Sequence, residues 1–401
     1  MNAVGRADRD DVSEFVARVA WSGLAEPGDR VAGALVDALG AVGAWRWLGG
    51  SLDAERPLVW GPVEARTGPL PAVQRARLER SVRRWATRWP TVDPERDLDD
   101  LSRLGGAVLV PGDPRWPAGI DDLGDERPFC LWVRGEPDLA GAWRRGIALV
   151  GSRAATSYGE RVAFDLAEGL SARGATVVSG GAYGIDAAAH RGSLAAGGPT
   201  SVVLAGGVDR TYPVGNARLF EAVVGGGGSV VAELGPGRLP TRSRFLQRNR
   251  LIAAGSRATV VVEAAWRSGA MSSAHHAARL LRPVGAVPGP VTSVASAGCH
   301  RLLRDGVAVC VTDAAEVAEL AGASGTDLVT ERAEAPRAGD GLDAVTRAVL
   351  EALPRRAPAD LATVASSAGV TTAEARAALG LLELDGSAVR SGGDWSLRAG
   401  G

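Results

Sequence analysis

The hydrophobic pattern changes its period along the chain, and these changes divide the chain into segments. From about residue 11 to 50, apolar residues recur at helical spacing, which predicts a small helical domain. A polar stretch with many arginines, roughly 72–88, predicts a further helix. Two short apolar runs, 107–112 and 129–135, predict strands that lead into or extend a central sheet.

Strands and helices then alternate from Ile147 to about Leu320. The predicted strands are 147–150, 175–179, 201–205, 229–233, 258–263, 284–287 and 307–311. The predicted helices are 158–173, 185–196, 216–224, 244–254, 270–281 and 313–320. This alternation is typical of an α/β fold with an extended Rossmann-like, mostly parallel, doubly wound sheet. In such sheets, ligands bind beyond the carboxyl ends of the strands.

The C-terminal part has a different pattern. Residues 321–342 lack periodicity and are rich in alanine, glycine and charge, which predicts a linker. Three helices and two short strands follow, with a turn at Gly369–Thr371, as in a winged-helix module. The predicted segments are a helical (SAM-like) domain at 1–70, an extended Rossmann-like domain at 71–320, the linker at 321–342 and a winged-helix-like domain at 343–401.

Charge is distributed unevenly along the chain. The formal net charge is only −1, and all 45 basic residues are arginine. Between Leu234 and Arg304, however, eleven arginines face a single acid, Glu263. Local potential rather than net charge attracts a polyanion, so this window predicts a phosphate-binding surface. Because Glu263 ends a predicted strand, we expect it to orient nearby arginines.

Several classes of function lack their sequence signals. The three cysteines show no CxxC spacing and the four histidines no metal signature, so we expect no metal and free thiols. No signal peptide and no stretch near the length of a membrane span are seen, which predicts a cytoplasmic protein without a membrane partner. A Walker A loop is impossible without lysine, and GxGxxG, GxSxG and HExxH are missing. We therefore expect no catalytic residues and no cofactor.

Three apolar strands each run directly into a glycine-rich polar loop, where bare backbone amides can bind phosphate. The candidate binding residues are Gly151, Ser152 and Arg153 after the first strand, Ser179, Gly180, Gly181 and Gly184 after the second, and Arg210 and Tyr212 after the third. At the first loop, the amides of the following helix and the Arg153 guanidinium would hold the phosphate together. Asp186 and His190 are better explained as structural residues, and Asp209 as the partner of Arg210.

The strongest single signal is residues 240–250, where basic residues interleave with one aromatic and no acid occurs. The candidates here are Arg242, Arg244, Phe245, Arg248, Asn249 and Arg250, with Ser268 and Gly269 on a later small-residue loop. Guanidinium groups beside a stacking ring are the means by which proteins hold single-stranded nucleic acid without reading its sequence.

Taken together, these motifs resemble the DNA processing protein A (DprA/Smf) family of bacterial natural transformation. The matching segments are GSRAATSYG, SGGAYGIDAAAHRG, LAGGVDRTYPVGN, FLQRNRLIAAGS, VVVEAAWRSGAMSSAHHA, AVPGP and GCHRLLRDGV, within about 100–320. The resemblance implies a homodimeric, non-catalytic protein that binds and protects single-stranded DNA and loads the RecA recombinase. It also implies that Arg153 binds phosphate and that Arg242, three residues before Phe245, belongs to the same surface.

Two other functions stay open at this point. The SGGAYGID loop also resembles that of nucleotide phosphoribohydrolases, although their acid-bearing PGGxGTxxE stretch is replaced here by AVPGPVTSVAS. Alternatively, residues 343–401 carry the main activity, and the protein is a winged-helix transcriptional regulator. The predicted recognition helix TAEARAALGLL is hardly basic, so a packing or dimer-contact role for this module is nearly as well supported.

Overall fold

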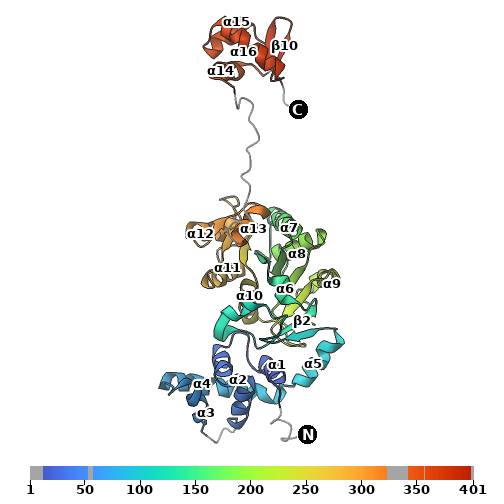
Figure 1. Cartoon of the computed structure of the whole chain (residues 1–401), viewed down its shortest axis with the longest axis vertical. Helices are drawn as coiled ribbons and strands as arrows, with labels where there is room; N and C mark the ends of the chain where they lie inside the picture. Colours follow the sequence, from blue (N-terminus) through green and yellow to red (C-terminus); the bar gives the residue numbers. More distant parts are fainter. Residues whose placement is uncertain (1–11, 53–56, 323–341, 356, 399–401) are drawn as a thin grey trace. The chain divides into compact units, whose positions relative to one another are not determined.

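The computed structural model describes residues 12–52, 57–322, 342–355 and 357–398. The chain divides into two compact units, residues 1–328 and 329–401 (Figure 1). Most of the predicted linker, 323–341, lies outside the described residues.

The first unit is built on a nine-stranded sheet in the order β1-β2-β6-β5-β4-β3-β7-β8-β9. Its strands are β1 (Ala107–Leu109), β2 (Leu131–Gly135), β3 (Gly146–Val150), β4 (Thr176–Gly180), β5 (Thr200–Leu204), β6 (Ser229–Ala232), β7 (Ala258–Val261), β8 (Val284–Ala286) and β9 (Val309–Cys310). The seven strands from β6 to β9 are parallel, whereas β1 and β2 add an antiparallel edge. The predicted mostly parallel sheet and its two-strand extension are confirmed.

Helices cover both faces of the sheet. They are α5 (Pro94–Arg103), α6 (Leu139–Trp143), α7 (Ser157–Ala172), α8 (Ile185–Ala195), α9 (Ala217–Gly225), α10 (Arg242–Ala254), α11 (Gly269–Arg279), α12 (Ala297–Arg304) and α13 (Ala314–Ala321). Alternate side chains of β3 show the two layers: Ile147 and Leu149 pack with α7, α8 and α13, while Ala148 and Val150 pack with α10 and α11. Burial on both faces explains why the strands read as continuous apolar runs. The short helices α5, α6 and α12 were not predicted.

The strand order creates a switch point between β3 and β7. From β3 the chain builds outward through β4, β5 and β6, and it then returns to the other side of β3 to add β7, β8 and β9. The loops after β3 and β7 therefore leave in opposite directions and open a crevice at their carboxyl ends, which is where doubly wound sheets bind ligands.

The N-terminal region is helical as predicted, with α1 (Glu14–Leu24), α2 (Arg30–Gly50), α3 (Gly61–Thr67) and α4 (Ala72–Arg88). Trp21 is fully buried at its centre and contacts Trp45, Trp85 and Phe129 at ring distances of 5.8, 5.4 and 5.7 Å. Since Trp85 belongs to α4, that helix is part of the same core, and the segment boundary at residue 70 stays a prediction.

Helix α2 is longer and more apolar than expected. By length and apolarity α2 would be able to cross a membrane, so the prediction that no stretch approaches a span was wrong. In the structure, eight of its side chains are buried in the helical core, and the chain kinks at Gly40, where φ is 73°.

The second unit contains α14 (Ala344–Ala352), α15 (Leu361–Ala368), α16 (Thr372–Leu384) and the hairpin β10 (Ala388–Ser391) and β11 (Asp394–Leu397). Gly369 ends α15 in the left-handed conformation, and Thr371 with Glu374 forms a capping box that starts α16. This is the predicted order of three helices and a wing. Leu379 and Trp395 are buried together in its core.

Candidate functional site

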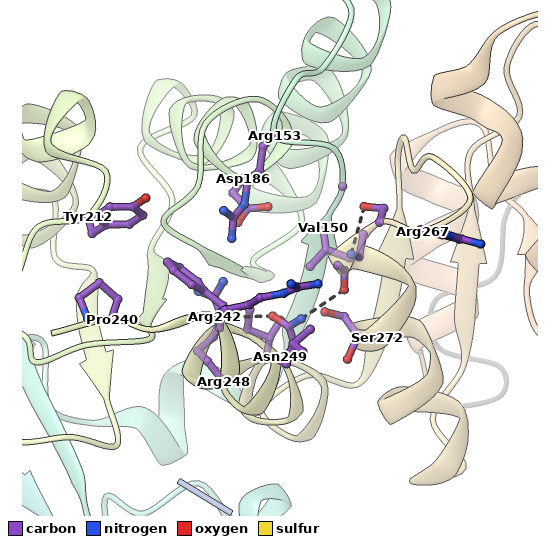
Figure 2. A pocket seen from close by; sticks show the side chains of 18 of the residues that line it. Val150, Arg153, Asp186, Tyr212, Pro240, Arg242, Arg248, Asn249, Arg267 and Ser272 are labelled. Carbon is purple, nitrogen blue, oxygen red and sulfur yellow. Dashed lines mark hydrogen bonds between the residues drawn. The ribbon is translucent and has the colours of Figure 1, made fainter. Parts of the chain in front are cut away.

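A pocket of about 580 Å³ opens at the switch point of the sheet (Figure 2). Val150 and Gly151 form its floor at the end of β3, and the beginnings of α10 and α11 form one wall. The other lining residues are Arg153, Asp186, Tyr212, Pro240, Thr241, Arg242, Phe245, Leu246, Arg248, Asn249, Ile252, Arg267, Ser268, Ala270, Ser272, Ser273 and Gly269. The pocket thus joins residues of four predicted motifs that are far apart in the sequence.

Two helix N-termini meet at this pocket. The Thr241 hydroxyl caps α10 by accepting from the Arg244 amide at 3.3 Å, and the Ser268 hydroxyl caps α11 by accepting from the Ala270 amide at 3.3 Å. Each N-terminus carries a partial positive charge from its helix dipole. Both dipoles therefore favour an anion in the pocket.

A cation and two aromatic rings lie in a row along the pocket. The Arg153 guanidinium lies over the Phe245 ring, 4.6 Å from its centroid, and the Tyr212 and Phe245 centroids are 5.5 Å apart at 53°. Arg153 and Tyr212 are exposed and Phe245 is half-buried. A guanidinium stacked on a ring still presents its edge N–H groups, which are the groups that bind phosphate. We name this row, Arg153–Phe245–Tyr212, the stacking row.

The pocket lining is strongly basic. It includes Arg153, Arg242, Arg248 and Arg267, against a single acid, Asp186. Arg242 and Arg267 are exposed, and the part of the chain that the structure describes offers neither of them an ion pair. Figure 2 shows Arg153 and Arg242 on different sides of the same hollow, one from the loop after β3 and the other from α10.

Beneath these exposed cations lies a buried pair, Arg248 and Asp186. Both are at the backbone of Gly180, where any side chain would collide with them. Burial raises the pKa of Asp186 despite the attraction of Arg248, and burial lowers the pKa of Arg248 to about 10. Arg248 also donates to the carbonyl of Val203, and Asp186 accepts from the Ala182 amide at 3.3 Å. This pair braces the loops, which agrees with the structural reading of Asp186.

Two predicted binding arginines have other partners. Arg250 is fully buried and pairs with Glu233 through two bonds of 2.7 and 2.8 Å, so it presents no surface to a ligand. Arg244 points away from the pocket and makes two bonds of 2.9 Å with Glu26 of the helical region. The prediction of a phosphate-binding surface is corrected for both residues, because each neutralises a carboxylate inside the protein.

The N-terminus of α7 also differs from the prediction. Its cap residue Thr156 donates its amide and its hydroxyl to the two carboxylate oxygens of Glu263, at 2.9 and 2.6 Å. Glu263 is buried and lies against Gly159 in the first turn. A carboxylate thus occupies the place that we assigned to phosphate, and Glu263 orients this helix rather than the arginines.

The second and third glycine loops contribute less than expected. Ser152, Ser179, Gly180, Gly181, Gly184 and Arg210 do not line the pocket. Ser179 is fully buried and donates to the Leu149 carbonyl at 2.5 Å, and Gly184 turns the chain at φ 72°. Arg210 forms an ion pair with Asp209 at 3.1 Å, and this is the partner that the sequence predicted for Asp209. These glycines serve close packing beneath the pocket.

His190 has a structural role. His190 is buried between the Thr200 hydroxyl at 2.7 Å and the Gly180 carbonyl at 2.8 Å, and burial lowers its pKa to about 4. Within the described ranges, no group of three His, Cys, Asp or Glu side chains is arranged to hold a metal ion.

The predicted binding residues included the α11 cap Ser268 but not the polar lining residues Thr241, Arg267, Ser272 and Ser273. Thr241 had a usable signal, because Thr is preferred immediately before a helix. Arg267 had none beyond its charge.

Two family models match the chain: "DNA recombination-mediator protein A" over residues 107–322 and "DprA winged helix domain" over 333–394. A Mycobacterium tuberculosis protein named DprA is 46% identical over 318 residues, which cover 76% of this chain and 80% of that protein. The DNA processing protein DprA of Streptococcus pneumoniae is 37% identical over 194 residues, or 48% of this chain and 67% of that one. The X-ray structure of the S. pneumoniae protein superposes with a TM-score of 0.57 at 27% identity, covering 77% of this chain and 97% of that chain.

Proposed function

The chain belongs to the DNA processing protein A (DprA/Smf) family, and from that premise we propose that its switch-point pocket holds a segment of single-stranded DNA during recombination. The observation that carries the proposal is the stacking row, with Arg242 on the other side of the same pocket. Aromatic rings stack on any base, and unopposed guanidinium groups accept any phosphate, so binding would not depend on sequence.

The exposed ring of Tyr212 favours an unpaired strand over a duplex. Tyr212 is 47% exposed, and its ring can stack only on a base whose face is free. Bases in a duplex are stacked on each other and offer their edges instead. The phosphates of either form would satisfy the arginines, but only the single strand uses the rings as well.

The proposed role is non-catalytic. The only acid that lines the pocket is Asp186, which is 6% exposed and held by the Ala182 amide. A phosphoribohydrolase needs an acid that reaches its substrate, and a hydrolase of the Ser–His type needs a base beside its nucleophile. His190 is committed to two structural hydrogen bonds. These assignments leave binding as the best-supported activity.

The wider role follows from family membership. We propose that the protein acts in the cytoplasm as a homodimer, protects incoming single strands in natural transformation or related recombination, and loads RecA onto them. No short motif marks the RecA contact, so this part rests on the family alone.

Fluorescence anisotropy with a labelled oligonucleotide tests the pocket. Arg153→Ala and Arg242→Ala are each expected to weaken single-strand binding irrespective of sequence and to reduce the salt slope of log K by about 0.7, the value for one phosphate contact. Arg210→Ala, on a residue outside the pocket, is the matched control. Unchanged affinity and slope in both pocket variants would refute the proposal.

A further inference from the structure

A second basic hollow, of about 540 Å³, lies beside the pocket, between α4 and the turn from α1 to α2. Its cations are Arg30, Arg77, Arg80 and Arg84, and Gln247 of α10 forms its edge. We name it the α4 groove. The proposed function of the pocket gives the α4 groove no role.

The arginines of α4 outnumber its acids, since six arginines accompany only Glu79. Four of them have carboxylate partners: Arg75 with Glu64, Arg83 with Glu79, Arg84 with Asp29 and Arg88 with Glu26. Arg77 and Arg80 are exposed and have no hydrogen bond or ion pair within the described residues. They are three residues apart and therefore lie on one side of the helix.

The acids that line the α4 groove are already engaged. Asp29 caps α2 through the Val31 amide at 3.1 Å and accepts from the Trp85 indole at 3.2 Å. Glu26 pairs with both Arg88 and Arg244. Burial raises the pKa of Glu26, but the two guanidinium groups outweigh it and hold the pKa below its ordinary value of 4.5. The groove therefore keeps an unbalanced positive charge at Arg77 and Arg80.

The α4 groove is fixed next to the pocket. Leu246 lines the pocket and the next residue, Gln247, lines the groove, so the two hollows meet across α10. The Arg244–Glu26–Arg88 triad ties α10 to the end of α4. Gly28, with φ 71°, lies against the end of the Gln247 side chain. Figure 1 shows α4 in the helical region.

We propose that the α4 groove receives the continuation of the strand held in the pocket, with Arg77 and Arg80 binding its phosphates. This inference rests on the proposed function of the pocket. A strand that leaves the pocket across α10 reaches a second surface of unopposed guanidinium groups. The protein need not rearrange to bind it, because the Arg244–Glu26–Arg88 triad already holds α10 and α4 together. The competing occupant is an acidic protein surface. In that case the effect of replacing Arg77 and Arg80 would not depend on the length of the DNA strand.

The test compares two lengths of oligonucleotide, about 6 nucleotides, near the lower end of the usual single-strand site sizes, and about 30 nucleotides, well above their upper end. Arg77→Ala/Arg80→Ala is expected to leave binding of the short strand unchanged. For the long strand, affinity should fall at least about 5-fold at 0.1 M salt, with a salt slope reduced by about 1.4, because two phosphate contacts are lost. Both residues are exposed, so thermal unfolding should not change.

The control is Arg66→Ala/Arg191→Ala, which removes the same charge from exposed positions outside both hollows. Equal long-strand affinity in the Arg77→Ala/Arg80→Ala variant and the wild type would overturn the inference. So would an equal loss in the control, or an equal loss for both lengths. A different result would show that the proposed function of the pocket itself is wrong: Arg153→Ala would then bind the short strand as tightly as the wild type.

Discussion

Replacing Phe245 separates stacking from charge at the pocket. Its ring is half-buried, with the Arg153 guanidinium 4.6 Å from its centroid and the Tyr212 ring 5.5 Å away. A Phe245→Leu variant keeps an apolar side chain in place but removes the aromatic face. The loss comprises base stacking, about 1–3 kcal/mol, and the cation–π contact that positions Arg153, about 0.5–1 kcal/mol.

A total near 2 kcal/mol corresponds to about 30-fold weaker binding of a single strand. The salt slope should not change, because no charge is removed, whereas Arg153→Ala should reduce it. Fluorescence anisotropy across a salt series measures both quantities. Leu246→Ala is the matched control, because Leu246 lines the same pocket from the next position of α10 without a ring. Wild-type affinity in Phe245→Leu would refute the stacking role, and a changed salt slope would refute the separation of the two effects.

Three further predictions concern the frame around the pocket. Arg250→Met should lower the free energy of unfolding by about 3–5 kcal/mol in chemical denaturation, because Glu233 is left as an unpaired buried charge; a loss below 1 kcal/mol would contradict the pairing. Burial lowers the pKa of His190 to about 4, so below pH 6.5 the unfolded chain takes up a proton that the folded chain does not. The free energy of unfolding should therefore fall by about 2 kcal/mol between pH 7 and 5, and this pH-dependent loss should be missing in His190→Gln. A chain that ends at Gly322 retains the whole pocket and should keep most of its single-strand affinity in the same anisotropy assay; loss of binding would favour the winged-helix unit as the main site.

The sheet was predictable because its strands are buried on both faces. A run such as 147–150 is apolar throughout, and only a strand or helix in the core has that composition. Strand β9 was overestimated, since the predicted 307–311 shortens to Val309–Cys310, both exposed at the sheet edge. An edge strand lacks the burial that makes a strand recognisable.

The pocket was predictable in outline but not residue by residue. Arg242, Arg244 and Arg250 look equivalent in sequence, yet only Arg242 faces the pocket. Arg244 is paired with Glu26, 218 positions away, and Thr156 with Glu263, 107 positions away. Sequence shows the charge of a residue, whereas its availability depends on which distant carboxylate the fold brings beside it.

The stacking row is a product of the topology in the same way. Its members come from the loop after β3, the loop after β5 and the first turn of α10. The sequence suggested each of them separately, on the ground that guanidinium and aromatic groups bind nucleic acid. Their contact depends on the switch point, which brings the carboxyl ends of β3 and β7 together with the start of α10.

The most direct test of the account is photo-crosslinking of the full chain to a single strand that contains 5-iodouracil, followed by trypsin and mass spectrometry. Trypsin cleaves this lysine-free chain after arginine, so the two rings fall on separate peptides, 211–218 and 245–248. The account predicts cross-links on Tyr212 or Phe245, suppressed by excess unlabelled single strand more than by duplex. Cross-links confined to residues 343–401, or to faces of the first unit away from the pocket, would contradict it.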